Sequence, residues 1–383
     1  MNRTVYYALA FAGLTAISSC SSSDIPSEVA SSENESVVFK IEVPTSLGTR
    51  AGGALGDVIT ADLTNLDYTV YKIEGSGDSK TATKVYSQSN TAFEVQDTEE
   101  VLNIALLKNV TYQVVFCAYN KDNGGFITYS DGTVTINYSK AVANNKDQDL
   151  FVGKSEEFTV TAPSTQSVQL TRPFAQLNWG SIDVLDGIFK DENGNIKEDM
   201  TATVKISQES IYNTLNVRTG EVSNPTSAND GGTDISLPTL YIKDIPAAKE
   251  NNTILFPVEN TANADRPYHL IAMNYLLVKP SQSASQAVSE DNESGESVAG
   301  STATISITVT NVNESETDKD VTITIDNAPL VPNYRTNIYG SLLSCPSIFN
   351  LSISQSFSNS TDNNDQYNHN TDNRTPENSD TND

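Results

Sequence analysis

Short segments in which apolar and polar residues alternate recur along most of this chain. The first of them places four apolar side chains on one face of a strand: Val37, Phe39, Ile41 and Val43. Residues 303–309 and 321–325 alternate in the same way. No long segment repeats its apolar residues every 3.6 positions, and turn-forming residues separate the segments. The sequence therefore predicts an all-β protein built from β-sandwiches.

The candidate strands fall into two sets. The first set covers residues 66–73, 85–95, 112–119, 133–138, 157–161 and 168–170, and the second covers residues 202–206, 212–217, 241–245, 253–258, 268–278, 303–309, 321–325 and 349–353. Residues 100–111 fit either a short strand or a helical turn. A length of 383 residues allows two or three domains, and the first set of strands ends near residues 165–180.

The N-terminus has the features of a bacterial export signal. Arg3 precedes an apolar run over residues 5–17, and Ser18 and Ser19 then lead into Cys20. Small residues directly before a cysteine resemble a lipobox, so we expect Cys20 to be acylated; the alternative is a plain signal peptide with an incidental cysteine. Residues 21–36 are rich in Ser and Glu and lack Lys and Arg, which is typical of a disordered tether.

The charge is strongly negative but unevenly distributed. The formal net charge is −26, which argues against nucleic-acid binding because phosphate contacts need a Lys/Arg surface. Residues 21–36, 281–300, 311–320 and 359–383 carry 18 of the 49 acidic residues and only two of the 23 basic ones. We therefore expect a mobile loop at 281–300 and a disordered acidic tail at 358–383, and the predicted strands are close to ordinary in charge.

The chain offers little material for catalysis or metal binding. It has two His and three Cys, and it lacks the common hydrolase, zinc and phosphate-binding motifs. We expect no enzyme activity, catalytic residue, metal or cofactor. His269 lies in an apolar segment and is expected to have a structural role. Cys117 and Cys345 are expected to be unpaired thiols rather than to form a disulfide. Trp179 is expected to pack near the domain junction rather than bind sugar.

The run from Asp191 to Asn195 has acids and amides at alternate positions, as calcium loops do. An EF-hand starting at Asp191 would need Gly at its sixth and Glu at its twelfth position, where Ile196 and Ala202 stand. A turn centred on Asn193 and Gly194 is the better interpretation.

Three stretches carry a resemblance to a known family: VVFKIEVPTSLGTRAGG (37–53), VQLTRPFAQLNWG (168–180) and VPNYRTNIYGSLLS (331–344). A fourth stretch between them, NNKDQDLFVGKSEEFTV (144–160), fits the same pattern. Together they resemble the fimbrillin-type lipoproteins of type V pili in Gram-negative bacteria. The resemblance implies two tandem transthyretin-like β-sandwich domains after the lipoprotein signal (1–20) and tether (21–36). We place these domains at 37–172 and 173–357.

The resemblance also implies a role. It implies a lipid anchor in the outer membrane, exposure on the cell surface or in fimbriae, and trimming by a trypsin-like protease, which here would cut after Arg50. Strand exchange would then release Val37, Phe39, Ile41 and Val43 and insert a strand of another subunit. Residues 349–357 are a candidate donor through Phe349, Leu351 and Ile353, or else the last strand of the second sandwich.

The expected function is thus a structural or adhesive pilus component. Its partners would be other pilus subunits, a host or bacterial surface ligand, and the outer membrane through the lipid. The tail beyond residue 358 departs from the pattern of a stalk subunit and favours a tip, accessory or non-pilus role. The alternative is a surface lipoprotein that never polymerises and binds a glycan or a protein.

Overall fold

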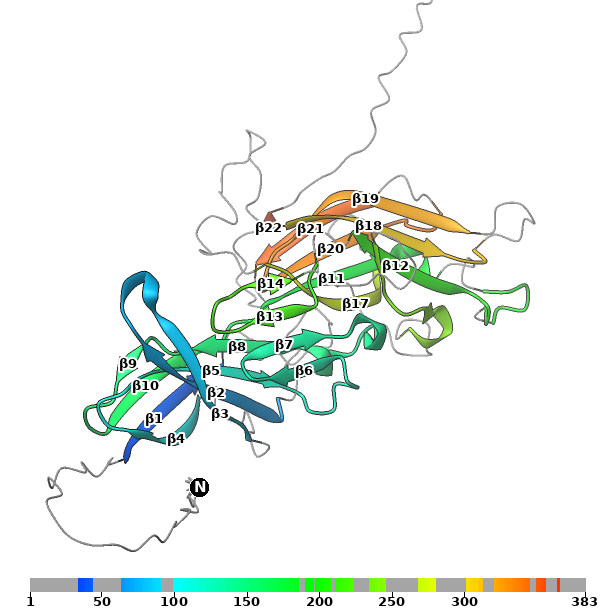
Figure 1. The fold of residues 1–383 in the computed structure, drawn as a ribbon. Coiled ribbons are helices and arrows are strands. Elements are labelled where there is room, and N and C mark those ends of the chain that lie inside the picture. Colours follow the sequence, from blue (N-terminus) through cyan, green and yellow to red (C-terminus); the bar gives the residue numbers. More distant parts are fainter. Residues whose placement is uncertain are drawn as a thin grey trace, which may run out of the picture.

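The structure, a computed structural model, is built almost entirely from β-strands (Figure 1). It describes residues 34–43, 63–90, 99–185, 190–195, 197–207, 211–223, 234–245, 268–279, 301–312, 320–344, 349–355 and 364–365. The helical elements of these residues are short 3-10 turns: η1 (Gly77–Ser79), η2 (Tyr138–Lys140), η3 (Lys146–Gln148), η4 (Ile182–Leu185) and η7 (Ile242–Asp244). In this part of the chain, no helix has the length and apolarity needed to cross a membrane. The all-β prediction is confirmed.

Two sheets form the first sandwich. Sheet A has the order β10-β1-β4, from β1 (Asn34–Glu42), β4 (Glu99–Leu107) and β10 (Ser164–Gln169). Sheet B has the order β3-β2-β5-β8, from β2 (Asn65–Glu74), β3 (Thr81–Asn90), β5 (Thr111–Tyr119) and β8 (Leu150–Lys154), with β9 (Phe158–Thr159) also on β5. The ambiguous segment 100–111 is mostly strand β4, and Asn109, at φ +62°, lies in the turn that follows it.

The two sheets of this sandwich meet along one side. A β-bridge joins Val152, in β8, to Thr171, two residues after β10. Gly153 lies so close to the end of β10 that a Cβ there would come within 2.8 Å of the Gln169 carbonyl oxygen and of a Leu170 methyl carbon. A larger residue at 153 would push the two sheets apart at this point.

The two central strands of sheet B, β2 and β5, are buried on both faces. In β5, Val114, Phe116 and Ala118 belong to the core shared with sheet A, whereas Val115 and Cys117 belong to the larger core beyond it. This explains why β5 is almost continuously apolar instead of alternating, since a strand covered on both sides has no solvent face.

Sheet C has the order β14-β13-β7-β6, from β6 (Ile127–Ser130), β7 (Thr133–Ile136), β13 (Thr214–Asn216) and β14 (Val222–Ser223). Its central pair joins Leu215 to Val134 across more than 80 residues of chain. This pair crosses the boundary that we predict at residues 172 and 173, so the two halves share a sheet. The boundary itself stays a prediction.

Two further sheets build the second half, where the later strands gather away from β1 (Figure 1). Sheet D has the order β17-β11-β20-β21-β22, from β11 (Phe174–Ser181), β17 (His269–Leu277), β20 (Tyr334–Gly340), β21 (Phe349–Gln355) and β22 (Asn364–Asp365). Sheet E has the order β15-β12-β18-β19, from β12 (Thr201–Ser207), β15 (Asp234–Ser236), β18 (Ser301–Val309) and β19 (Val321–Leu330), with β16 (Leu240–Tyr241) on β12.

The alternating strands of the second half behave as predicted. Ile305 and Ile307 of β18 and Ile323 and Ile325 of β19 are buried, and they share one core with Trp179 of sheet D. The Thr residues between them on β19 are exposed. The predicted strand at 253–258 and the predicted loop at 281–300 lie outside the described residues.

Candidate functional site

Strand β1 lies between two partners in sheet A. Its residues 34–42 pair antiparallel with β4, and residues 37–42 pair parallel with β10. The Leu170 amide also donates to the Glu42 carbonyl oxygen at 2.8 Å. We call the position between β4 and β10 the strand slot. A segment in this slot is recognised by main-chain hydrogen bonds on both of its edges.

The alternation of β1 predicts which of its side chains are buried. Val37, Phe39 and Ile41 have no exposed surface, and Val43 is 4% exposed. Between ring centroids, Phe39 lies 5.5 Å from Phe116 of β5 and 5.8 Å from Phe158 of β9. The slot thus recognises apolar groups at every second position, with a large aromatic group near the middle.

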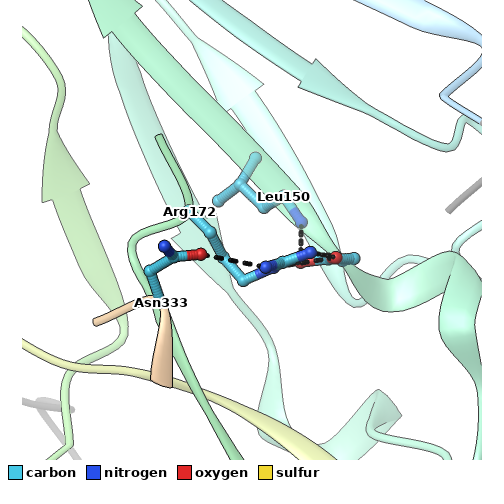
Figure 2. A network of polar contacts seen from close by, with 4 residues as sticks. Leu150, Arg172 and Asn333 are labelled. Atoms are coloured by element: carbon cyan, nitrogen blue, oxygen red, sulfur yellow. Dashed lines mark hydrogen bonds and ion pairs between the residues drawn. The ribbon is translucent and has the colours of Figure 1, made fainter. Parts of the chain in front are cut away.

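A second candidate site lies where the two halves meet, and it is polar. Asp149 precedes β8, Arg172 lies between β10 and β11, and Asn333 precedes β20. Arg172 donates from Nε to the two Asp149 carboxylate oxygens at 2.7 and 2.9 Å, and from Nη2 to Oδ2 at 2.6 Å. Its Nη1 donates to the Asn333 side-chain oxygen at 3.0 Å (Figure 2). We call these three residues the clamp.

The ion pair of the clamp is fully enclosed. The side chains of Arg172 and Asp149 are 1% and 0% exposed, and the guanidinium lies over the Phe151 ring at 4.6 Å. Burial raises the pKa of Asp149, while the charge and hydrogen bonds of Arg172 and the Leu150 amide oppose that shift. A buried pair of this kind is costly to break by removal of one partner, because the other charge is left without compensation.

The clamp brings together three of the four stretches that fit the family pattern. Asp149 lies in 144–160, Arg172 in 168–180 and Asn333 in 331–344. The sequence marks these stretches by their resemblance but does not reveal that their polar residues meet. The available signal was weak: Asp149 directly precedes the apolar residues 150–152 and Arg172 directly precedes the apolar residues 173–175, and a charged residue that is drawn into a core is seldom buried unless it is paired.

Sheet D has further polar groups on its buried strands. Gln176 and Asn178 of β11 and Asn337 of β20 are 1% exposed or less. The Asn178 amide donates to the Asn337 side-chain oxygen at 2.8 Å, which links two parallel strands. Both polar atoms of the Gln176 side chain are without a hydrogen-bond partner among the described residues.

The candidate donor strand is part of sheet D. Residues 349–355 form β21, which pairs antiparallel with β20 along its whole length, and Phe349 and Leu351 are 8% and 4% exposed. In the backbone register, Ile353 lies opposite Thr336. In this structure the segment is the last long strand of its own half, and β22 pairs with its other edge.

The remaining candidate residues are distributed as follows. Cys20, Arg50 and Cys345 lie outside the described residues. Cys117 is a buried free thiol, and Trp179 is buried in the core, as predicted. His269 is buried at the start of β17, but its Nδ1 has no hydrogen-bond partner in the part of the chain that the structure describes.

The run at Asp191 forms a turn. Its Oδ1 accepts from the amides of Asn193 and Asn195 at 2.9 and 2.8 Å, and Gly194 has φ +80°. The carboxylate thus organises its own loop, as in an Asx turn. Among the described residues, no group of three or more His, Cys, Asp or Glu side chains is arranged to hold a metal ion.

A match to a family model covers most of the chain. Residues 29–375 match the model of a family of unknown function, DUF6562, and the chain belongs to this family. No curated protein matches the sequence.

Several solved structures show a weak similarity to this fold. The fimbrial anchor protein Mfa2 from Porphyromonas gingivalis has a TM-score of 0.40 at 9% identity, and the match covers 84% of this chain and 96% of that one. A fimbrial assembly protein from Parabacteroides distasonis has a TM-score of 0.34 at 12% identity, with the same coverage of 84% and 96%. At these scores and identities, the likenesses carry no information on what this chain does.

Proposed function

We propose that this chain is a surface-anchored, fimbrillin-like lipoprotein with a structural or adhesive role, and that its subunits join by strand exchange. The observation that carries the proposal is the strand slot. The N-terminal β1 fills it with alternating apolar side chains and with main-chain pairing on both edges. The resemblance of the four sequence stretches to fimbrillin-type lipoproteins supports the same role.

Strand addition supplies the physical basis of assembly. Main-chain hydrogen bonds to β4 and β10 would hold any extended segment, and the apolar positions would select one with the spacing of Val37, Phe39 and Ile41. The direction is also specified, because an occupant must run antiparallel to β4 and parallel to β10. Residues 349–357 remain a candidate donor, and a copy that donates them would have to release β21 from β20.

Proteolysis would make β1 exchangeable. Arg50 follows Val43 by seven residues, and a cut after it separates β1 from the rest of the chain. The released part includes Cys20, which we propose to be the lipidated residue that anchors the protein at the outer membrane. With two or more acyl chains, such an anchor is stable, at about 0.8 kcal/mol per buried methylene.

The test compares Arg50→Ala with the wild type and with Arg374→Ala, a control in the acidic tail. Surface protein is extracted in SDS without heating and separated by size. We expect a ladder of oligomers from the wild type and from Arg374→Ala, and monomer from Arg50→Ala. A ladder of equal strength from Arg50→Ala would contradict cleavage at this residue.

The alternative is a surface lipoprotein that does not polymerise and binds a glycan or a protein. The observation that favours it is that β1 and β21 are both fully paired within their own chain. It predicts monomer from all three proteins in the same experiment.

A further inference from the structure

The contacts that hold β10 set the conditions for exchange at the slot. Within the described residues, the sheet hydrogen bonds of β10 go to β1 alone, because β10 is the edge strand of sheet A. When β1 leaves, β10 therefore loses its sheet pairing, and only its two ends and its buried side chains keep it in position. Val168 and Leu170 supply those buried side chains, at 2% and 0% exposure.

The segment that leads into β10 is hydrogen-bonded at Val160 to the turn between β4 and β5. The Val160 amide donates to the Val110 carbonyl oxygen at 3.0 Å, and the Asn109 amide donates to the Val160 carbonyl oxygen at 2.7 Å. Neither contact involves β1. Residues 161–163 separate this anchor from the start of β10 at Ser164, so it fixes the entry of β10 rather than its whole course.

The end that follows β10 is tied by the bridge and the clamp. Val152 and Thr171 exchange two main-chain hydrogen bonds, at 2.8 and 2.9 Å. The next residue is Arg172, whose ion pair with Asp149 is the one fully enclosed ion pair found in the described residues. Asn333 adds a third point of attachment from the second half of the chain. Hydrogen bonds between charged partners are stronger than neutral ones, so this is the firmest hold on β10 that does not depend on β1.

We propose that Asp149 and Arg172 are positioning residues for strand exchange, which hold the β10 wall of the slot in place while β1 is absent. The inference rests on the proposed function in one respect, namely that β1 leaves the slot. A slot whose wall stays in place can accept a new strand at once, whereas a detached β10 would first have to be reordered at an entropic cost. The hydrogen bonds of the clamp described above join Arg172 to Asp149 and Asn333 and not to β1, so the proposed effect on the slot runs through β10.

The test is amide hydrogen exchange of the full chain, followed strand by strand. Arg172→Lys keeps the charge but loses the forked contact with Asp149, and Asn333→Ala removes the third attachment only. Lys243→Arg, at the exposed pair with Glu198, is the matched control. We expect the amides of β1 and β10 to exchange at least about tenfold faster in Arg172→Lys, and less so in Asn333→Ala, because local opening becomes easier. The amides of β12 and β18 in sheet E should exchange as in the wild type.

Two results would overturn the inference. One is unchanged exchange of β10 and β1 in Arg172→Lys. The other is faster exchange of β10 only in step with β12 and β18, which would show that the clamp contributes general stability alone. The measurement needs neither cleavage nor assembly, so a chain that shows the expected exchange pattern but no oligomers would refute the proposed function and leave the clamp's effect on β10 standing.

Discussion

Strands β1 and β11 both lie inside a sheet, yet they bury different kinds of side chain. β1 buries Val37, Phe39 and Ile41, and the surrounding core requires only apolar side chains of suitable size at these positions. β11 buries the amide side chains of Gln176 and Asn178, and Asn178 donates a hydrogen bond to the Asn337 side-chain oxygen on the neighbouring strand. Apolar packing tolerates substitution when volume and spacing are kept, whereas buried polar groups favour one arrangement over others. The proposed strand exchange needs only this apolar spacing at the slot, whereas the contact between Asn178 and Asn337 ties β11 to one particular partner strand, β20.

The largest expected effect is at the clamp. Arg172→Met leaves the Asp149 carboxylate buried and uncompensated, and we expect the free energy of unfolding to fall by about 3–5 kcal/mol. The double variant Asp149→Leu with Arg172→Met should recover most of this loss, since it removes both charges. Urea unfolding gives the values, with Lys243→Met, at an exposed pair, expected to cost less than about 1 kcal/mol. A loss below about 1 kcal/mol in Arg172→Met would show that the buried pair does not fix the junction.

A loss of similar or slightly smaller size is expected in the slot. Phe39→Ala removes a ring packed against Phe116 and Phe158, and cavities of this kind cost about 3–5 kcal/mol. Val38→Ala, on the opposite and partly exposed face of β1, is the control and should cost less than about 1 kcal/mol. Equal losses measured by urea unfolding in the two variants would contradict the one-sided burial of β1.

A smaller effect of the opposite sign is expected inside sheet D. Gln176→Leu replaces an amide that lacks hydrogen-bond partners among the described residues by an apolar group of similar size. We expect the free energy of unfolding to stay the same or to rise by about 1 kcal/mol, because an unsatisfied buried amide is costly. The same urea experiment checks this, and a loss above about 2 kcal/mol would show that Gln176 makes an essential polar contact.

The smallest effect is a dependence on pH. Burial lowers the pKa of His269 below its usual value of about 6.5. Above that pH, the imidazole is neutral in both the folded and the unfolded chain. As the pH falls below it, the unfolded chain takes up a proton before the folded chain does, so the unfolding free energy falls until the folded-state pKa is reached. His269→Gln should flatten this part of the stability curve, and an unchanged curve would contradict the burial of a neutral His269.

The sequence predicted the fold where one strand face meets solvent. β1, β18 and β19 alternate clearly, and the predicted bounds of β1 and β18 lie close to the observed ones, whereas β19 continues beyond its predicted end at residue 325 to Leu330. Segment 100–111 stayed ambiguous because it is short, although Leu102, Ile104 and Leu106 of β4 do alternate and are buried.

The pairing of strands that are distant in the chain could not be predicted from the sequence. The pairing of Leu215 with Val134 in sheet C, and the meeting of Asp149, Arg172 and Asn333, depend on how distant segments approach one another. No local pattern encodes either, because both arise only when the sheets pack. The buried face of β1 could therefore be predicted from its own alternation, whereas its neighbours β4 and β10 and the clamp could not.

Mass spectrometry of the mature N-terminus shows whether β1 is an exchangeable strand. The protein is isolated from assembled fibres on the cell surface, and its first residue is determined. We predict a chain that begins at Ala51, after removal of β1 with the lipidated segment. An intact chain that begins at acylated Cys20 in assembled fibres would contradict the account.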